Sequence, residues 1–121
     1  MSVLTWTLVV LIGGAGSVLR FLVDKTVVGR FGRALPWGTL TVNLTGALLL
    51  GLLSGLALSH DVALVAGTAA VGSYTTFSTW MLETQRLGEE RQLLFAGANL
   101  GASVVLGVAA ATLGQVIGAH L

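Results

Sequence analysis

The sequence predicts an all-α membrane protein, built as one domain over residues 1–121. Hydrophobic residues make up 55% of the chain and charged residues only 9%, whereas a soluble domain carries roughly 25% charged residues. The uncharged runs 1–19, 34–60, 62–82 and 92–121 each suffice for a membrane-spanning helix, which needs about 20 residues. Seventeen glycines and one proline favour close contact between such helices. We therefore expect four transmembrane helices, at about 3–23, 37–58, 62–82 and 92–119.

Charge and cysteine content exclude several classes of function. A net charge of +1 leaves no footprint for nucleic acid. Without cysteine the chain has no disulfide and no thiolate metal site. No acidic residue lies within an expected helix, and the sequence has neither a catalytic triad nor a phosphate-binding loop. We therefore do not expect an enzyme.

The first expected helix carries small residues around Gly13 and Gly16, which allow a neighbouring backbone to approach closely. Arg20 ends its apolar run, and from the residues alone this side chain is expected to extend to the membrane surface. The basic segment 24–35 is expected to be a linker. Pro36 then suits the first turn of the next helix.

The second expected helix contains an amide at hydrocarbon depth. Asn43 lies about 9 Å beyond Trp37 at 1.5 Å per residue, and an unpaired polar group in lipid costs several kcal/mol. This amide therefore either bonds to a neighbouring helix or lines a wet path. Gly51 and Gly55 form a GxxxG contact face. The short turn at 60–61 makes the second and third helices antiparallel neighbours.

The stretch 72–80 is the least regular part of the third expected helix. Gly72 and the hydroxyl residues that follow it weaken helical hydrogen bonding. At 1.5 Å per residue Gly72 lies roughly 16 Å from Asp61, near the middle of a hydrocarbon core about 30 Å thick. A helix broken at that depth can bind an ion through its unpaired backbone groups. The alternative is an ordinary helix whose polar residues pack on its neighbours.

The side chains of this stretch fit a small ion, but they leave its sign open. Phe77 and Trp80 are three residues apart and share a helix face. Their ring edges would suit an anion, and their ring faces would suit a cation. The neutral donors expected inside the bilayer are Asn43, Thr75, Thr76, Ser78, Thr79, Asn99 and Ser103.

The last expected helix follows a charged linker at 83–91. Its polar or small residues at spacing four share one face; they are Asn99, Ser103, Gly107 and Ala111. Gly97 with Gly101, and Gly114 with Gly118, are further GxxxG pairs. Four short-linked helices can hardly enclose a water-filled path alone, so we expect an oligomer.

Three motifs, taken together, resemble the Fluc/CrcB family of fluoride channels. They are Gly13-Gly14-x-Gly16-x-x-x-Arg20-Phe21, Gly38-Thr39-Leu40-x-Val42-Asn43-x-x-Gly46 and Gly72-x-x-Thr75-Thr76-Phe77-Ser78-Thr79. The resemblance covers the whole chain, including its length and the number of expected helices.

The resemblance implies a passive fluoride channel of the cell (plasma or inner) membrane, which lowers cytoplasmic fluoride. Family members form four-helix subunits that pair antiparallel into a dimer with two pores. Their third helix is broken, and backbone carbonyls at the break hold a structural sodium ion on the dimer axis. By motif match those carbonyls belong to Gly72 and Thr75. Arg20 matches an arginine at the end of the first helix.

The resemblance also assigns an ion pathway. Asn43 lies along the fluoride path, and Phe77 and Trp80 present ring edges to it. The residues placed on the path are Asn43, Phe77, Ser78, Thr79, Trp80 and Ser103. Trp80 departs from the family, which has a second phenylalanine there, and its indole adds an N–H donor. The hydroxyls that the family carries at spacing four on the last helix give way here to Gly107 and Ala111, so only Ser103 is carried over.

The basic residues add a prediction about orientation. All six fall between Arg20 and Arg33 or at Arg86 and Arg91, which are linkers expected on the same side of the bundle. The positive-inside rule then predicts a single orientation, with both termini outside. An antiparallel dimer of identical chains needs both orientations, so the partner is either a second copy or a homologous chain of opposite bias.

Two other functions stay open. One is a small proton-coupled exporter of the small multidrug transporter type, which needs a membrane-embedded glutamate in its first helix; this first helix has none. The other is a non-conducting partner subunit that only packs through its GxxxG faces. The polar lining expected from Asn43 and the hydroxyls of 75–79 counts against it.

Overall fold

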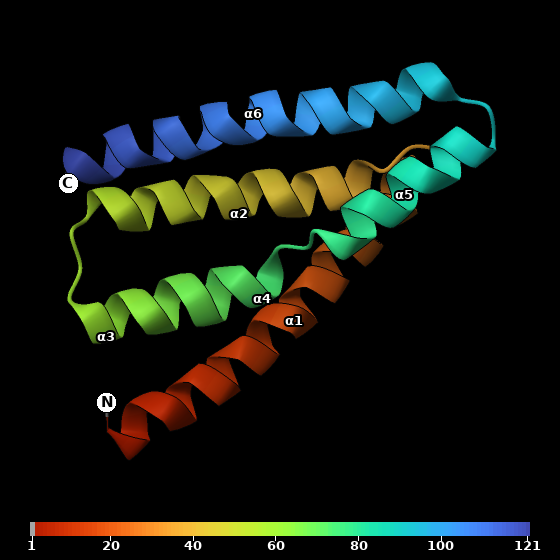
Figure 1. The fold of residues 1–121 in the computed structure, drawn as a ribbon. Helices are drawn as coiled ribbons and strands as arrows, with labels where there is room; N and C mark the ends of the chain where they lie inside the picture. The colour runs from red at the N-terminus through yellow and green to blue at the C-terminus, as the bar shows by residue number, and fades with distance from the viewer. Residues whose placement is uncertain (1) are drawn as a thin grey trace.

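The computed structural model describes residues 2–121, and over that range the chain is all-α (Figure 1). Three helices are long and apolar enough to cross a membrane, namely α1 (Val3–Phe31), α2 (Trp37–Gly55) and α6 (Leu93–Ala119). Shorter helical pieces lie between α2 and α6: α3 (His60–Ala63), the π-helical stretch η1 (Leu64–Val71), α4 (Gly72–Tyr74) and α5 (Ser78–Glu89). The prediction of a helical membrane protein is confirmed at this level.

Helix boundaries differ from the expected ones where charged residues occur. α1 runs to Phe31 rather than to about residue 23, and it stops at Gly32, whose φ is 80°. The segment expected to be a linker is helical because it contains no proline, and lysine and arginine are good helix formers. The same applies to the second charged segment, most of which belongs to α5. Charged residues mark where a helix leaves the hydrocarbon, which is not where the helix ends.

α2 packs most extensively against α6, while α1 crosses η1, α2 and α4 (Figure 1). The α2–α6 contact is made by two of the three predicted GxxxG pairs, Gly51 with Gly55 and Gly114 with Gly118. A Cβ atom at Gly55 would lie 2.7 Å from the Ala119 nitrogen, and one at Gly114 would lie 2.8 Å from the Leu52 nitrogen. Gly101, by contrast, has no neighbouring atom within 4 Å of such a Cβ atom. Backbone-to-backbone contact therefore joins α2 and α6 near one end of the bundle.

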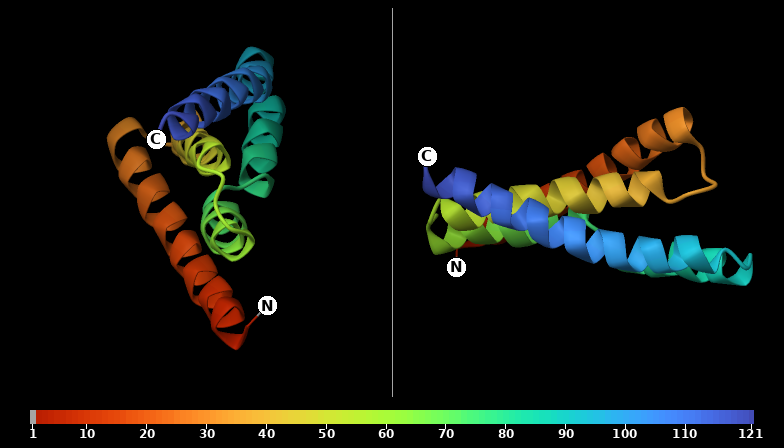
Figure 2. Two further views of the ribbon diagram at one scale, coloured as in Figure 1. Left: turned by 90° about the vertical axis from the view of Figure 1, so that its left-hand side faces the viewer. Right: turned by 90° about the horizontal axis from the view of Figure 1, so that it is seen from above.

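Both termini lie at one end of the bundle, together with the connection from α2 to α3 (Figures 1 and 2). The α1–α2 and α5–α6 connections lie at the opposite end, where the basic residues gather. Arg86 links these two connections, because its Nη2 donates to the carbonyl oxygens of Arg33 at 3.1 Å and Ala34 at 3.3 Å. Its Nη1 lies 3.2 Å from Glu90. Except for Arg20, the basic side chains therefore lie toward this end, although Lys25, Arg30 and Arg86 belong to helices rather than linkers.

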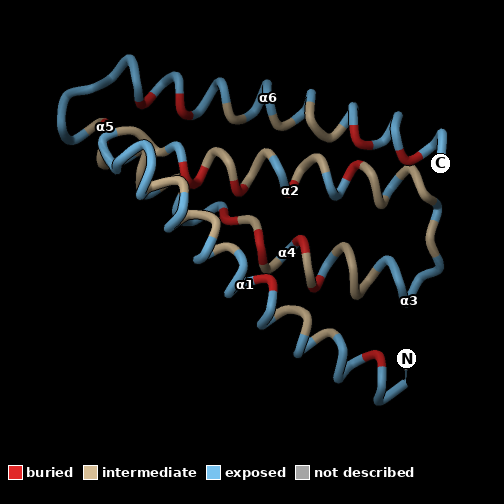
Figure 3. The backbone as a smooth tube through the Cα atoms, turned by 180° about the vertical axis from the view of Figure 1, so that it is seen from behind, coloured by how far each residue is buried: buried red, intermediate tan, exposed pale blue. Residues whose placement is uncertain are grey.

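Only a narrow core is buried within one chain. Buried positions follow the faces where α2 and α5 pack on α6 and where α1 packs on η1 and α4 (Figure 3), and the fully buried side chains include Val42 of α2 and Leu87 of α5. Large apolar side chains remain exposed along α1 and α6. Lipid covers such surfaces in a membrane-spanning helix, and a second protein chain can do the same.

Candidate ion pathway

The chain leaves helical geometry between α4 and α5, over residues 75–77. Thr75 is extended, with ψ of 162°. Two side chains bond to carbonyls of the preceding turn: the Ser73 hydroxyl donates to Ala69 at 2.6 Å, and the Thr75 hydroxyl donates to Val71 at 3.1 Å. Such side chain-to-backbone bonds compete with the helix. The irregularity that the sequence suggested around 72–80 thus begins three residues after Gly72, which itself is helical.

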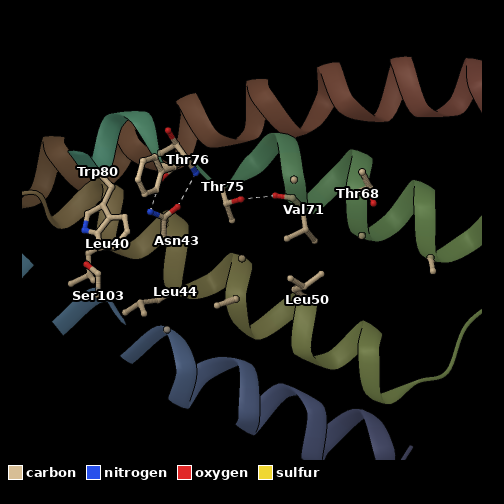
Figure 4. Close-up of a pocket in the computed structure, with 17 residues that line it drawn as sticks. Leu40, Asn43, Leu44, Leu50, Thr68, Val71, Thr75, Thr76, Trp80 and Ser103 are labelled. Atoms are coloured by element: carbon tan, nitrogen blue, oxygen red, sulfur yellow. Dashed lines mark hydrogen bonds between the residues drawn. The ribbon is translucent and has the colours of Figure 1, made fainter. Parts of the chain in front are cut away.

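Asn43 of α2 holds the non-helical segment through both ends of its amide. Its Nδ2 donates to the Thr76 carbonyl at 2.8 Å, and its Oδ1 accepts from the Thr76 N–H at 2.9 Å (Figure 4). Thr76 is buried, with 8% of its surface exposed. The amide thus bonds to a neighbouring element, as one of the two interpretations predicted, and it also lines a groove.

Arg20 reaches the same segment from α1. Its Nη1 donates to the Thr75 carbonyl at 3.4 Å, and the side chain is half-buried. This differs from the expectation drawn from the residues alone, which placed its charged end at the membrane surface. The carbonyl left unpaired by the break attracts the guanidinium, because an unpaired backbone group at this depth needs a partner.

An open groove of about 610 Å³ runs beside the break, between α2, η1, α4 and α6. It brings together six of the residues placed at the site by resemblance: Asn43, Gly72, Thr75, Phe77, Trp80 and Ser103 (Figure 4). The rings of Phe77 and Trp80 meet edge to face, with centroids 5.7 Å apart. Phe77 is 69% exposed in the single chain, so the groove is open on that side.

Ser78 and Thr79 do not line this groove. Both are exposed, and Thr79 lines two smaller cavities of about 190 and 340 Å³ on the other side of the break. Thr76 lines both the groove and the smaller of these cavities. Its hydroxyl lies 3.4 Å from Ser78 Oγ and 3.3 Å from Thr79 Oγ1. The groove and the smaller cavity therefore meet at Thr76. The sequence analysis had named this residue only as a neutral hydrogen-bond donor.

The two smaller cavities contain acidic residues that sequence reasoning missed. Asp24 lines both cavities and Glu83 lines the larger one, and each lies on a helix rather than in a linker. The Thr39 hydroxyl donates to Glu83. The statement that no acidic residue lies within a helix is thus wrong, because α1 and α5 extend beyond the expected spans. Glu83 lies one helical turn beyond Trp80. Its position on a helix could be recognised only once α5 was known to extend to Glu89.

Trp80 is bonded to α6 by its indole. Its Nε1 donates to the Asn99 carbonyl at 3.0 Å. The Asn99 side chain donates in turn to the Thr84 hydroxyl at 2.8 Å, and that hydroxyl donates to the Trp80 carbonyl at 2.9 Å. The N–H donor that distinguishes tryptophan from phenylalanine is therefore used within the protein.

Comparison with known sequences identifies the family. Residues 7–115 match the family described as CrcB-like protein, Camphor Resistance (CrcB). The chain belongs to the CrcB family. The relatives are named fluoride-specific ion channels. One from Mycobacterium tuberculosis (strain H37Rv), FluC 2, is 67% identical over 95% of this chain and 91% of its own length.

More distant CrcB relatives carry the same name. FluC 1 of Symbiobacterium thermophilum is 44% identical over 95% of this chain and 98% of its own length. FluC of Syntrophotalea carbinolica is 44% identical over 88% of this chain and 90% of its own length. The resemblance read from the three motifs is confirmed. So is the prediction that the chain is not an enzyme, since the curated relatives of this CrcB protein are ion channels.

Proposed function

We propose that this chain forms a passive, fluoride-selective channel through which fluoride leaves the cell across the plasma membrane. The observation that carries the proposal is the 67% identity, over nearly the whole chain, to relatives named fluoride-specific ion channels. The site supports it, because the groove combines ring edges with neutral donors. No carboxylate lines the groove, so an anion meets no like charge there.

Fluoride is small and tightly hydrated, so its passage requires donors that replace the lost water. In our proposal Phe77 and Trp80 supply ring edges, which carry partial positive charge. Ser103 supplies a hydroxyl from α6, and Ser78 and Thr79 supply hydroxyls on the other side of the break. Asn43 holds the break in place through Thr76 and borders the path.

In this proposal the pieces from α3 to α5 together act as the third of four transmembrane helices, broken near the bilayer midplane. An antiparallel partner subunit closes the groove and gives the dimer two pores. The exposure of Phe77 in one chain supports this, because a ring that is 69% exposed at the open side of the groove offers apolar surface that a second chain can cover. The GxxxG face at Gly97 and Gly101, which has no neighbour within the chain, is also available to a partner.

The backbone at the break suits a structural sodium ion on the dimer axis. The Thr76 N–H would bond to the Gly72 carbonyl in a continuous helix, but it donates to Asn43 instead. The Gly72 carbonyl thus loses its helical partner, and the Thr75 carbonyl has only the long bond from Arg20. Carbonyls of an unwound helix are common ligands of sodium in membrane proteins. Replacing sodium by a bulky organic cation should lower the fraction of dimer; an unchanged fraction would rule out this role.

The basic end of the bundle supports one preferred orientation, with both termini outside. Because the chain lacks cysteine, single cysteines introduced near each terminus can be labelled from either side of the membrane. Labelling from the outside only would support pairing with a homologous chain of opposite bias. Near-equal labelling from both sides would instead establish a dimer of identical chains.

The test of the main proposal is ion efflux from liposomes that contain the purified chain, with chloride as the control ion. We expect rapid fluoride efflux, little chloride efflux and no dependence on a proton gradient. Flux that requires a proton gradient would overturn the passive mechanism and indicate an exporter. If the chain alone is silent, and remains so when co-reconstituted with a homologous chain of opposite charge bias, the channel proposal fails.

A further inference from the structure

We propose that Trp80 determines anion selectivity as a ring locked in place, whose indole N–H is bonded to α6 so that only ring C–H edges face the groove. This inference rests on the proposed channel function. It concerns the residue at which the chain departs from the family pattern.

The lock consists of two hydrogen bonds between α5 and α6 and one within α5. The indole Nε1 donates to the Asn99 carbonyl at 3.0 Å, which fixes the rotation of the ring about its side-chain bonds. Asn99 is itself buried, with 9% of its surface exposed, and its amide bonds to the Thr84 hydroxyl at 2.8 Å. Thr84 closes the network by donating to the Trp80 carbonyl at 2.9 Å. The indole N–H, the Asn99 amide nitrogen and the Thr84 hydroxyl thus each donate to a partner inside the protein.

The opposite side of the ring borders the groove. In Figure 4 the indole nitrogen lies on the side of the ring away from Asn43. Phe77 packs against the indole with an angle of 83° between the two ring planes. The indole is therefore held by a hydrogen bond on one side and by an edge-to-face contact on the other. Such contacts between aromatic rings have a preferred geometry.

A fixed ring has a consequence for selectivity. A strong N–H donor in the groove would hold any small halide, whereas C–H edges are weak donors that help only an ion in close contact. Fluoride is smaller than chloride, so a rigid opening can keep the edges within reach of fluoride and exclude chloride. If the indole were free to rotate, the opening would widen and the N–H could turn toward the ion. Releasing the lock should therefore raise chloride flux relative to fluoride flux.

The decisive variant replaces Trp80 by its benzothiophene isostere, in which sulfur takes the place of the N–H group. Ring size and shape are kept, and only the hydrogen bond to Asn99 is lost. We expect the ratio of chloride to fluoride efflux to rise about fivefold, the ratio that corresponds to about 1 kcal/mol, the net worth of one hydrogen bond. The same isostere at Trp6 is the matched control, since Trp6 is 55% exposed and is not among the residues that line the groove, and it should keep the wild-type ratio.

A flux ratio separates this role from a purely structural one, because poorer folding or assembly lowers both fluxes together. An isostere with the wild-type ratio would overturn the proposal. If the wild-type protein shows no fluoride efflux, that result contradicts the proposed channel function and not the hydrogen-bonded ring. The hydrogen bond of the Trp80 indole is then tested separately by hydrogen exchange of ¹⁵N-labelled indoles. Exchange at Trp80 at least tenfold slower than at Trp6 would support the lock, and equally fast exchange would refute it.

Discussion

The α2–α6 contact makes Gly114→Ala the most informative single substitution for the fold. An added Cβ atom would lie 2.8 Å from the Leu52 nitrogen and 3.1 Å from the Leu48 carbonyl carbon, whereas ordinary contact begins near 3.4 Å. Both neighbours are backbone, so no side chain can turn aside. The helices must separate by more than about half an ångström, which forfeits a quarter or more of each van der Waals contact at the interface. Overpacking of this kind costs about 1–3 kcal/mol.

The assay is thermal unfolding of the purified protein in detergent. A loss of that size should lower the midpoint by roughly 4–15 °C for a chain of this length. Gly29→Ala of α1 is the control, because its Cβ atom would also meet nothing within 4 Å. Removing a helical glycine there should leave the midpoint unchanged or raise it, since alanine has the higher helix propensity. Equal midpoints for the two variants would refute the close packing of α2 and α6.

Two further substitutions test the break and the basic end. Asn43→Ala removes both hydrogen bonds to the Thr76 backbone and should cost about 2–4 kcal/mol; a wild-type unfolding midpoint together with wild-type fluoride efflux would contradict the role given to this amide. Arg86→Ala loses the bonds to the Arg33 and Ala34 carbonyls, but its side chain is 36% exposed. Arg86→Ala should lower the free energy of unfolding by less than about 1 kcal/mol and should retain fluoride efflux. An unfolding midpoint more than 10 °C below that of the wild type would show that these bonds contribute more to stability than this.

Much of the fold follows from hydropathy and glycine spacing. The apolar runs located α1, α2 and α6 because a bilayer requires about 20 apolar residues per span. The Gly51/Gly55 and Gly114/Gly118 pairs predicted helix contacts, although the sequence could not say that they face each other. The ends of α1 and α5 were missed because hydropathy reports where a helix leaves lipid. Helix ends depend instead on local stops such as Gly32, whose positive φ ends α1.

The site was predictable only in part. The motifs named Asn43, Phe77, Trp80 and Ser103, and the structure gathers them at one groove. The partners that give these residues their roles were hidden, because a hydrogen bond between helices depends on their relative rotation and depth. The sequence could not predict the bond from the Trp80 indole to the Asn99 carbonyl, since every residue has a backbone carbonyl and residue type therefore does not identify the acceptor. Glu83 was missed for the related reason that α5 continues past the expected end of its span.

Thr76 borders the groove on one side of the break and a smaller cavity on the other, and in the proposed channel this arrangement limits how far an ion must travel without water. If both openings fill with water, the dry part of the route is about one residue long, roughly 3.5 Å. Each ion then sheds its hydration shell over a distance close to its own diameter. A short dry passage is a way to combine strong discrimination between halides with rapid flow. The discrimination would then depend on a few atoms around one peptide unit, and most of the remaining chain would serve to hold that unit still.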